Sequence, residues 1–409
     1  MRLFKKLRRM IDKIFKTSHS KSQDPPSNAT PYEGTRSEIQ QGRYIFPAES
    51  ERHEATILGF PSRSSLPPDK YDAVCAELAE LATAIAEFEL VRIYVRPDDK
   101  THLETLLQNT GRDLTSVTII PCPINHAWVR DTGPVYIRDA TGKFPGRRFA
   151  INFRFNEWGG KKPEGDGLCW GQRWPPLDDK ALQENTDFAR WVIDHDFDPG
   201  PVTRVDSPIR AEGGAFVTDG EGTLLITESS IICDVRNPGM SKARIEGELK
   251  RLLGIQKVIW LPGRRNVDIC DVHMDARARF VRPGVIVYSR PHDTAAEVWR
   301  KISAEVNEIL GRERDSKGRT LQIYTIEEPD PKGLAGGSNE ELSASYVNFY
   351  FVNGGLIIPK FGDEERDQRA LELLSSLVPD RVIRQVYTNA IPLTGGVMHS
   401  VTQQVPSMG

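Results

Sequence analysis

The sequence predicts one α/β or α+β domain, because short strand-like segments alternate with amphipathic helical segments over most of its length. The strand-like segments are rich in β-branched and aromatic residues, as in ATILGF and LVRIYV. The helical segments carry apolar residues at spacings of three and four, which is the period of an α-helix. The recurring unit contains two or three strands and one helix, and the residues themselves show no repeat.

The expected elements follow one another closely from residue 55 onward. Apolar residues at helical spacing predict helices at 71–88, 103–107, 180–193, 241–253, 295–310 and 365–377. Apolar and β-branched runs predict strands at 55–60, 90–95, 127–137, 215–217, 223–226, 257–262, 271–280, 321–326, 346–351 and 356–359, and a last strand that ends near Tyr387.

Glycine and proline mark several boundaries of these elements. The dipeptide Asp219-Gly220 is typical of a tight hairpin, and Gly254 is expected to end the helix before it. The strand at 127–137 is expected to break at Thr132-Gly133-Pro134 and then to resume. The segment 158–176 is rich in Gly, Trp and Pro, which predicts a long surface loop.

The composition is that of a globular protein without a polyanionic partner. Of the 409 residues, 38% are hydrophobic and 27% are charged, and the formal net charge of −3 argues against nucleic-acid binding. The five cysteines are odd in number and widely spread, which favours a reducing compartment and a cytoplasmic location. No apolar run approaches the roughly 20 residues of a membrane-spanning helix.

The N-terminal segment differs from the rest of the chain. The stretch MRLFKKLRRMIDKIFK predicts a basic amphipathic helix, which resembles a mitochondrial leader or an anchor for weak contact with a membrane surface. A frayed extension without a role is an equal alternative. Residues 17–41 are rich in Ser, Pro, Asn and Gln, which indicates a linker. We therefore expect a leader and linker at 1–41 and a folded domain at 42–409.

Four polar clusters stand beside glycines or at the ends of strand-like segments. They are WVRDTGP at 128–134, EGG at 212–214, DVHMDARARF at 271–280 and GGVMHSVTQQ at 395–404. Glycine beside a charged residue lets a ligand approach the backbone closely. Each cluster alone is also typical of a turn or of solvated charge, so the combination carries the functional argument.

The third cluster places His273 and Asp275 two residues apart on an expected strand. Side chains at i and i+2 share one face of a strand, so an imidazole and a carboxylate would project together, as proton transfer beside a fixed charge requires. A strand-edge histidine paired with a neighbouring aspartate is the structural alternative. Cys270 lies at an odd separation from His273, so we expect it on the opposite face as a small buried hydrophobic residue.

Taken in this order, the clusters resemble the motifs of the agmatine deiminase and bacterial-type (Porphyromonas-type) peptidylarginine deiminase family. WVRDTGP is similar to W-x-R-D-x-G-P, EGG to the E-G-G segment, VHMD to the H-x-D motif and GGVMHSVTQQVP to G-G-x-x-H-C-x-T-Q-Q-x-P. The resemblance covers roughly residues 44–406. It implies the pentein fold, a single-domain five-bladed α/β propeller with pseudo-fivefold ββαβ units around a central site, with no cofactor and no metal.

The resemblance also implies roles for individual residues. Asp131 and Asp275 would grip a guanidinium, which is a planar cation that carboxylates can bind through paired hydrogen bonds. His273 would protonate the leaving ammonia and then deprotonate the incoming water, and Glu212 would orient and charge that imidazole. Trp128 or Trp158 is a candidate aromatic wall of the pocket.

The chain departs from the family at the nucleophile, because Ser400 stands where the motif has cysteine. A hydroxyl ionises far less readily than a thiol and attacks poorly without an adjacent base. The resemblance implies hydrolysis of agmatine to N-carbamoylputrescine and ammonia, a step of putrescine and polyamine biosynthesis, or deimination of arginine in a peptide. Activity of the Ser400 form would be impaired or lost.

Two other classes of function stay open. A non-catalytic pentein that binds a guanidino ligand or a protein partner agrees with Ser400. His273, Asp275 and His399 also mimic the two-histidine, one-carboxylate triad of iron oxygenases, although 400–409 lacks the arginine that 2-oxoglutarate enzymes of this kind carry after the distal histidine. The expected partner is a small guanidino substrate, namely agmatine or arginine in a peptide, and a homodimer stays open.

Overall fold

The computed structural model describes residues 44–144, 147–160, 176–196, 200, 202–334 and 343–408. All of these residues belong to one unit of the chain, Gly34–Gly409. The basic helix expected at the N-terminus, the linker expected at 17–41 and most of the loop expected at 158–176 lie outside the described residues.

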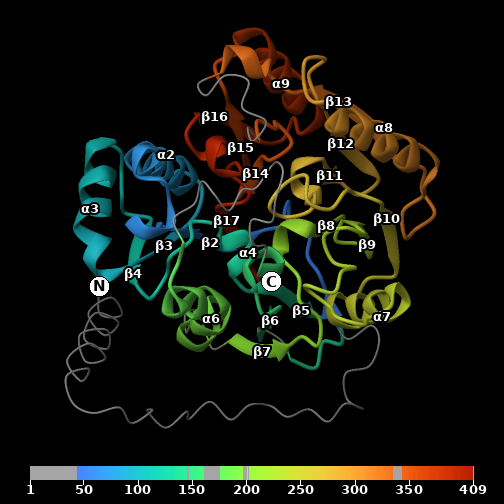
Figure 1. Ribbon diagram of the computed structural model, residues 1–409, viewed down its shortest axis with the longest axis horizontal. Coiled ribbons are helices and arrows are strands. Elements are labelled where there is room, and N and C mark those ends of the chain that lie inside the picture. The colour runs from blue at the N-terminus through green and yellow to red at the C-terminus, as the bar shows by residue number, and fades with distance from the viewer. Residues whose placement is uncertain are drawn as a thin grey trace. The chain divides into compact units, whose positions relative to one another are not determined.

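The strands of the described residues form five sheets, and every sheet contains an antiparallel pair followed by a parallel pair. A helix connects the two parallel strands of each sheet, because parallel neighbours need a crossover connection. Figure 1 shows the long helices at the periphery and the sheets inside them. Each sheet therefore contains one ββαβ unit.

Three sheets have three strands each. They are β8 (Val217–Thr218), β9 (Thr223–Thr227) and β10 (Lys257–Leu261); β11 (Ala278–Arg282), β12 (Val285–Arg290) and β13 (Gln322–Glu327); and β14 (Tyr350–Val352), β15 (Gly355–Lys360) and β16 (Val382–Tyr387). Their crossover helices are α7 (Lys242–Leu253), α8 (Glu297–Arg312) and α9 (Glu364–Leu377).

Two sheets have four strands each. One contains β1 (Tyr44–Ile45), β5 (Val135–Asp139), β6 (Arg148–Asn152) and β7 (Val202–Asp206), with α6 (Asp179–His195) as its crossover helix. The other contains β17 (Thr402–Pro406), β2 (His53–Gly59), β3 (Val91–Val95) and β4 (Val117–Pro121), with crossover helices α2 (Pro68–Ala86) and α3 (Lys100–Asn109).

The C-terminal strand closes the sheet that begins the fold. β17 pairs antiparallel with β2 and places Gln403 opposite Ile57 (Figure 1). This pairing brings the tail cluster beside the one-turn helix α4 (Val129–Thr132), where the backbone N–H of Arg130 donates to the carbonyl oxygen of Ser400 at 3.3 Å. Residues that are 270 positions apart in the sequence therefore meet at the candidate site.

The expected helices are confirmed by α2, α3, α6, α7, α8 and α9. Gly254 follows α7 with φ +68°, and β8 and β9 form the antiparallel hairpin expected at Asp219-Gly220. The strands β1, β4, β6, β7 and β17 were not expected from the sequence. Each pairs with a neighbour far away along the chain or across a crossover, and short segments of this kind carry a weak local pattern.

Two expected strands are wrong in part. The segment 127–137 contains the helix α4, and its strand β5 begins only at Val135. The segment 271–280 contains a 3-10 helix, Met274–Ala276, and its strand β11 begins only at Ala278. In both places a polar motif lies in a turn of helix before the strand, so its side chains do not follow the two-residue period of a strand.

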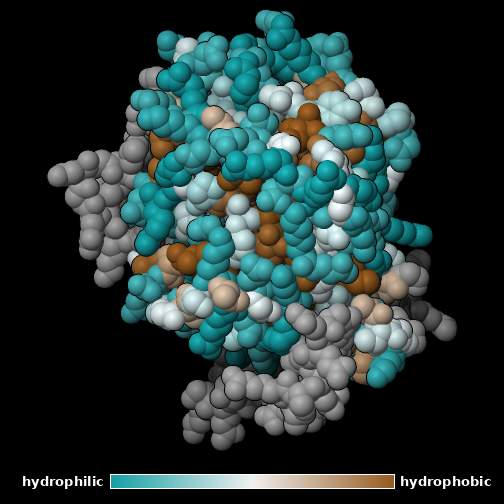
Figure 2. All heavy atoms as spheres, turned by 90° about the vertical axis from the view of Figure 1, so that its right-hand side faces the viewer, coloured by the Kyte–Doolittle hydropathy of each residue, from teal (hydrophilic) through white to brown (hydrophobic). Residues whose placement is uncertain are grey.

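Charged and polar side chains cover most of the face shown in Figure 2, with hydrophobic residues in small groups between them. Within the described residues, the exposed large hydrophobic side chains are Leu90, Val235, Tyr324, Val382 and Tyr387. None of the described helices combines the length and the apolar character that a membrane span requires.

Candidate active site

One pocket is lined by residues from three of the four polar clusters predicted from the sequence, and the fourth, at 212–214, lies directly behind it. Its lining comes from α4, from the short segment α5 (Glu157–Gly160), from the turn before β11, from the loop before β14 and from the C-terminal tail. The lining residues with chemical function are Trp128, Asp131, Trp158, Asp268, Cys270, His273, Asp275, Arg277, Asn348 and Ser400. The pocket therefore has an acidic wall and contains an imidazole, a thiol and a hydroxyl.

Asp131 is held in place by two donors from different parts of the chain. The backbone N–H of Gly214 donates to its Oδ1 at 3.0 Å, and the indole N–H of Trp158 donates to its Oδ2 at 2.9 Å. Burial raises the pKa of Asp131 above its ordinary value, with a further increase from the neighbouring Glu212 and Asp275 carboxylates, and His273 opposes this effect. A cation placed beside Asp131 would relieve this unfavourable burial of negative charge.

Trp158 is buried rather than exposed on a surface loop, which corrects the expectation for 158–176. Its ring packs on Phe155 with centroids 4.9 Å apart. The preceding residue, Glu157, is fixed by His126 Nε2 at 2.9 Å and by the amide of Asn185 at 2.8 Å. These contacts hold the indole against Asp131.

His273 lies between two carboxylates. Its Nε2 lies 3.2 Å from Glu212 Oε2, and its Nδ1 lies 3.7 Å from Asp131 Oδ1. Burial alone would lower the pKa of His273, but Cys270, Asp131 and Glu212 outweigh it and raise this pKa well above 6.5. These neighbours therefore favour the protonated imidazole, which is the form that can donate a proton.

Glu212 is held by a buried guanidinium. Arg236 Nε donates to its Oε1 at 2.8 Å and to its Oε2 at 3.1 Å, while Arg236 Nη1 donates to Asp271 Oδ2 at 2.8 Å. Burial alone would raise the pKa of Glu212, yet Arg236 and His273 hold this pKa below its usual range. Glu212 therefore stays negative and keeps His273 positive.

The second carboxylate of the pocket, Asp275, is bound by His399. His399 Nδ1 lies 2.7 Å from Asp275 Oδ2, and His399 Nε2 lies 2.7 Å from Glu49 Oε2. Burial would raise the pKa of Asp275, but the hydrogen bond and charge of His399 and the charges of His273 and Arg279 hold it below its usual range. Asp275 is therefore ionised in the pocket.

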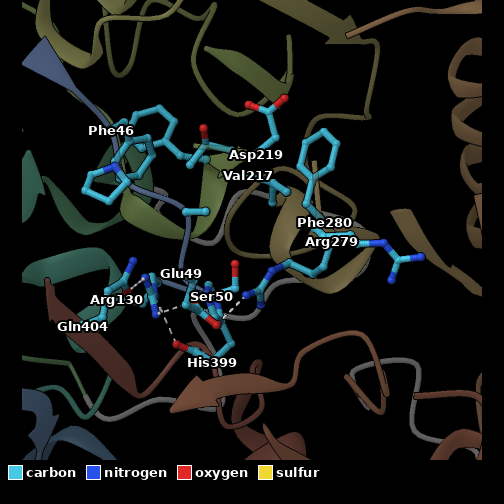
Figure 3. Close-up of a pocket in the computed structure, with 15 residues that line it drawn as sticks. Phe46, Glu49, Ser50, Arg130, Val217, Asp219, Arg279, Phe280, His399 and Gln404 are labelled. Atoms are coloured by element: carbon cyan, nitrogen blue, oxygen red, sulfur yellow. Dashed lines mark hydrogen bonds and ion pairs between the residues drawn. The ribbon is translucent and has the colours of Figure 1, made fainter. Parts of the chain in front are cut away.

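Glu49 links this site to a second, smaller pocket. Figure 3 shows Glu49, Arg130 and His399 pointing toward one another, with Arg279 beside them. Glu49 Oε1 accepts from Arg279 Nη2 at 2.7 Å, and Glu49 Oε2 accepts from Arg130 Nη2 at 3.3 Å. The guanidinium groups hold the pKa of Glu49 well below its ordinary value, against the effect of burial. The network fixes His399 from the side away from the substrate pocket.

Gly214 sits where no side chain fits. A β-carbon built on it would lie 2.6 Å from His273 Nδ1, 2.9 Å from Asp131 Oδ1 and 3.3 Å from Asp275 Oδ2. The glycine therefore lets the E-G-G backbone approach all three polar side chains at once. The same measurement shows that His273 and Asp275 face a common point although they do not lie on a strand.

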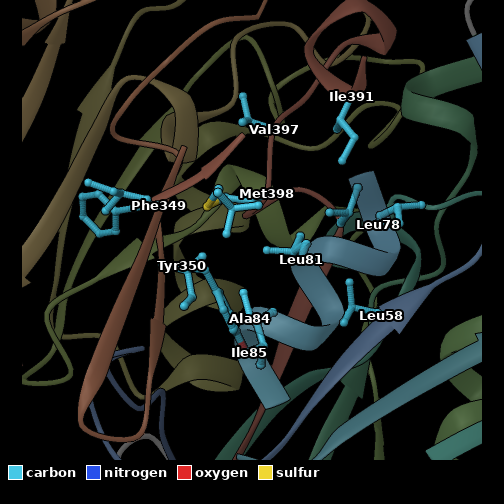
Figure 4. Packing of buried hydrophobic residues seen from close by; sticks show 14 of the residues in the cluster. Leu58, Leu78, Leu81, Ala84, Ile85, Phe349, Tyr350, Ile391, Val397 and Met398 are labelled. Atoms are coloured by element: carbon cyan, nitrogen blue, oxygen red, sulfur yellow. The ribbon is translucent and has the colours of Figure 1, made fainter. Parts of the chain in front are cut away.

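Apolar packing positions the tail that carries Ser400. Val397 and Met398 are completely buried in the largest core cluster, where Met398 lies beside Tyr350 and Leu81 of α2 (Figure 4). Two residues further on, Ser400 reaches the pocket, and a β-carbon on Gly396 would lie 2.9 Å from its Oγ. Among the described residues, no hydrogen bond joins Ser400 Oγ to a carboxylate or an imidazole.

The structure brings all six residues selected from the sequence together. Trp128, Asp131, His273, Asp275 and Ser400 line the pocket, and Glu212 contacts His273 from behind. The expectation that Cys270 faces away is wrong, because Cys270 lines the same pocket. The reason is the backbone turn at Asp271 and Val272, whose φ angles of +62° and +70° break the alternation of a strand.

Other residues of the site were missed by the sequence analysis. They are Glu49, Arg236 and Asn348. The sequence contains no local signal for Glu49 or Arg236, since each acts through a partner more than 20 positions away. Within the described part of the chain, no group of three or more His, Cys, Asp or Glu side chains is placed to hold a metal ion.

The fold and the site together define an α/β protein with a buried acidic pocket that also contains an imidazole, a thiol and a hydroxyl. Residues 45–406 match the family described as Porphyromonas-type peptidyl-arginine deiminase, and the chain belongs to this family.

Relatives and solved structures are similar to this protein over nearly the whole length of its chain. A Latilactobacillus sakei protein named as an agmatine deiminase is 32% identical over 382 residues, which are 89% of this chain and 96% of the relative. The agmatine deiminase of Enterococcus faecalis has a similar structure, with a TM-score of 0.75, 27% identity and coverage of 91% of this chain and 98% of that chain. A Porphyromonas gingivalis protein named as an arginine deiminase gives a TM-score of 0.73, 26% identity and coverage of 89% and 98%.

Proposed function

We propose that this protein hydrolyses the guanidino group of agmatine to N-carbamoylputrescine and ammonia, a step toward putrescine. The observation that carries the proposal is the pair Asp131 and Asp275, which face a common point beside the imidazole of His273. Two carboxylates around one cation, with a protonated imidazole next to them, suit a reaction that binds a guanidinium and expels ammonia. The names of the relatives support the same reaction.

The arrangement of the sheets supports a five-bladed pentein propeller as the scaffold of this reaction. Five ββαβ units among the described residues would form the blades, and the pairing of β17 with β2 would close the first blade. In this arrangement each blade sends a turn toward the centre, which explains why the pocket residues come from distant parts of the sequence.

In the proposed reaction, Asp131 and Asp275 bind opposite sides of the guanidinium. The fixed donors on Asp131, namely Gly214 N–H and the Trp158 indole, orient this carboxylate before the substrate arrives. His273 donates its proton to the departing amino group and then takes a proton from the attacking water. Glu212 is a positioning residue that keeps His273 oriented and charged.

The charge of the pocket favours agmatine over free arginine. Three aspartates, Asp131, Asp268 and Asp275, line the described part of the pocket, and the arginine there, Arg277, lies 3.2 Å from Glu328. An arginine substrate would need a cation for its carboxylate. Agmatine carries an ammonium group at the same end, so its two positive charges suit the acidic lining.

Free thiols support a reducing compartment for this activity. Cys75, Cys122, Cys233 and Cys270 form no disulfide among the described residues. We expect the reaction to take place in the cytoplasm for this reason.

A non-catalytic guanidino-binding protein is the second candidate function. It rests on Ser400, whose hydroxyl has no hydrogen bond to a carboxylate or an imidazole within the described residues and so has no base to activate it. A binder of this kind would keep the two carboxylates and would release no ammonia.

The test combines binding and turnover. Agmatine should raise the melting temperature of the protein, since a ligand that binds only the folded state stabilises it, whereas putrescine, which lacks the guanidino group, should raise it much less. Asp131→Asn should remove most of the agmatine effect, and Asp293→Asn, at an exposed aspartate, is the matched control.

Turnover is then followed as ammonia and N-carbamoylputrescine released from agmatine by the natural chain and by Ser400→Cys. Product from the natural chain supports the hydrolase, whereas product from Ser400→Cys alone would show that the site fits the reaction but that the natural chain does not catalyse it. Binding without product from both proteins would replace the hydrolase with the binding protein, and the absence of binding would refute both.

A further inference from the structure

Cys270 shares the pocket with the residues that would bind the guanidinium. It lies three residues before His273, and both side chains line the cavity together with Asp131 and Asp275. We propose that Cys270, rather than Ser400, supplies the nucleophile for the reaction, with His273 as its acid–base partner. This inference rests on the proposed function and assigns its covalent step to a residue outside the family's tail motif.

The thiol has neighbours that can control its ionisation. Cys270 Sγ donates to Asp268 Oδ1 at 3.4 Å. Burial raises the pKa of Cys270 to about 11, the Asp268 carboxylate adds to this increase, and the charge of His273 opposes it. A bound guanidinium would add a second positive charge beside the thiol, which favours the thiolate further. Substrate binding and activation of the nucleophile are therefore coupled.

Ser400 lacks such neighbours. No carboxylate or imidazole within the described residues accepts a hydrogen bond from its Oγ. Its close contact is with the tail itself, since a β-carbon on Gly396 would lie 2.9 Å from Ser400 Oγ and 2.7 Å from the Trp128 ring. Of the two candidate nucleophiles, only Cys270 has a hydrogen bond to an ionisable side chain among the described residues, namely Asp268, and it shares the pocket with His273 three residues further on.

Asn348 shows independently that the pocket is built for a ligand. Its side chain is 1% exposed, and its Oδ1 accepts from the backbone N–H of His399 at 3.0 Å, which sets the orientation of the amide. Its Nδ2 has no hydrogen-bond partner among the described residues. A buried donor without a partner is unfavourable, so an acceptor on a ligand would complete it. The oxygen of the attacking water or of the ureido product is such an acceptor.

The proposed step needs no external oxidant or reductant. The Cys270 thiolate adds to the central guanidinium carbon and forms a C–S bond. His273 gives its proton to one terminal nitrogen, the C–N bond breaks and ammonia leaves, which produces a cationic amidino thioether.

Water completes the reaction in the same pocket. Neutral His273 takes a proton from water as the oxygen adds to that carbon. The C–S bond then breaks, its electron pair returns to sulfur, and the hydroxyl proton leaves to solvent as the carbonyl of the product forms. The protein ends as thiolate and imidazolium, as it began.

The experiment compares the natural chain with Cys270→Ser, Ser400→Ala and Ser400→Cys, with Cys75→Ala on α2 as a thiol control outside the pocket. The natural chain and Cys75→Ala should both release ammonia from agmatine. Cys270→Ser should lower kcat on the order of a thousandfold or more. Ser400→Ala should lower it far less. Agmatine should still raise the melting temperature of Cys270→Ser, which shows that its pocket is folded.

Acid quenching during turnover gives a direct readout. Digestion and mass spectrometry should show an adduct with the mass of agmatine minus ammonia on the peptide that contains Cys270, and Cys270→Ser should lack it. Chloroacetamidine, an amidinium that alkylates thiolates, should label Cys270, and agmatine should protect it.

The possible failures are distinguishable. An adduct on Ser400, or full activity in Cys270→Ser, would overturn this inference and leave the proposed function standing. Activity in Ser400→Cys with a silent natural chain would overturn this inference together with hydrolysis by the natural chain. If agmatine binds and both the natural chain and Ser400→Cys are silent, both the inference and the hydrolase are refuted.

Discussion

Replacing Arg236 should destabilise this protein more than replacing an exposed arginine, because its guanidinium neutralises two buried carboxylates. The side chains of Arg236, Glu212 and Asp271 are at most 1% exposed, and Arg236 donates to each carboxylate at 2.8 Å. Arg236→Met keeps much of the apolar stem and removes the charge. The two carboxylates would then be buried beside each other without their common cation.

Breaking a buried ion pair by removing one partner costs about 3–5 kcal/mol, whereas an exposed pair contributes about 0–1 kcal/mol. With an m value of about 3 kcal/mol/M for a chain of this size, the urea midpoint of Arg236→Met should fall by roughly 1–1.7 M. The matched control is Arg369→Met, which breaks the exposed pair with Glu365, whose side chains are 64% and 66% exposed. Its midpoint should move by less than about 0.3 M.

The pH dependence gives a second check on the same variant. In the natural protein the folded-state pKa of Glu212 is lowered, so its contribution to stability is present above its unfolded pKa and is lost as the pH falls through the folded pKa. In Arg236→Met, burial raises the pKa of Glu212, so protonation of Glu212 at lower pH removes a buried negative charge that has lost its partner. The difference between the two proteins should therefore shrink as the pH is lowered from 8 to 5. Equal urea midpoints for Arg236→Met and Arg369→Met would refute the reasoning.

Three further predictions concern the pocket. Burial raises the pKa of Asp131, and a guanidinium binds the carboxylate form of this residue. The agmatine dissociation constant measured by calorimetry should therefore increase as the pH falls below this raised pKa, by up to about tenfold per pH unit. Asp131→Asn should lack this pH dependence. Gly214→Ala would place a methyl group 2.6 Å from His273 Nδ1 and should abolish the thermal shift caused by agmatine, whereas Gly247→Ala, in open space on α7, should keep it. Trp158→Phe loses the 2.9 Å indole hydrogen bond to Asp131 and should weaken agmatine binding by roughly tenfold or more. An unchanged affinity would show that the indole does not position Asp131 for binding.

The sequence could predict the elements whose pattern is local. Six helices were predicted from apolar residues at helical spacing, and the end of α7 was predicted from Gly254. The hairpin between β8 and β9 was predicted from a turn dipeptide. Periodicity and turn chemistry act over a few residues, so they can be read without knowledge of the partners.

The identity of the site residues was also available from the sequence, since Asp131, Glu212, His273, Asp275 and Ser400 all belong to short motifs. The residues that hold these side chains in place could not be identified from the sequence. Arg236 and Glu49 bind their partners across 24 and 350 positions, and no local pattern distinguishes them from ordinary surface charges.

The sequence by itself determined the helices, the α/β class and the polar motifs, whereas the tertiary structure alone decided which way Cys270 points. The alternating pattern at 271–280 predicted a strand, but Asp271 and Val272 take positive φ angles that are unfavourable for a β-branched residue. Contacts from distant segments help to compensate this cost: Arg236 Nη1 donates to the Asp271 carboxylate at 2.8 Å, and Ser229 Oγ donates to the Asp271 carbonyl at 2.6 Å. The turn places Cys270 and His273 in one pocket. The local sequence could not predict this turn, because distant residues supply contacts that offset its backbone strain.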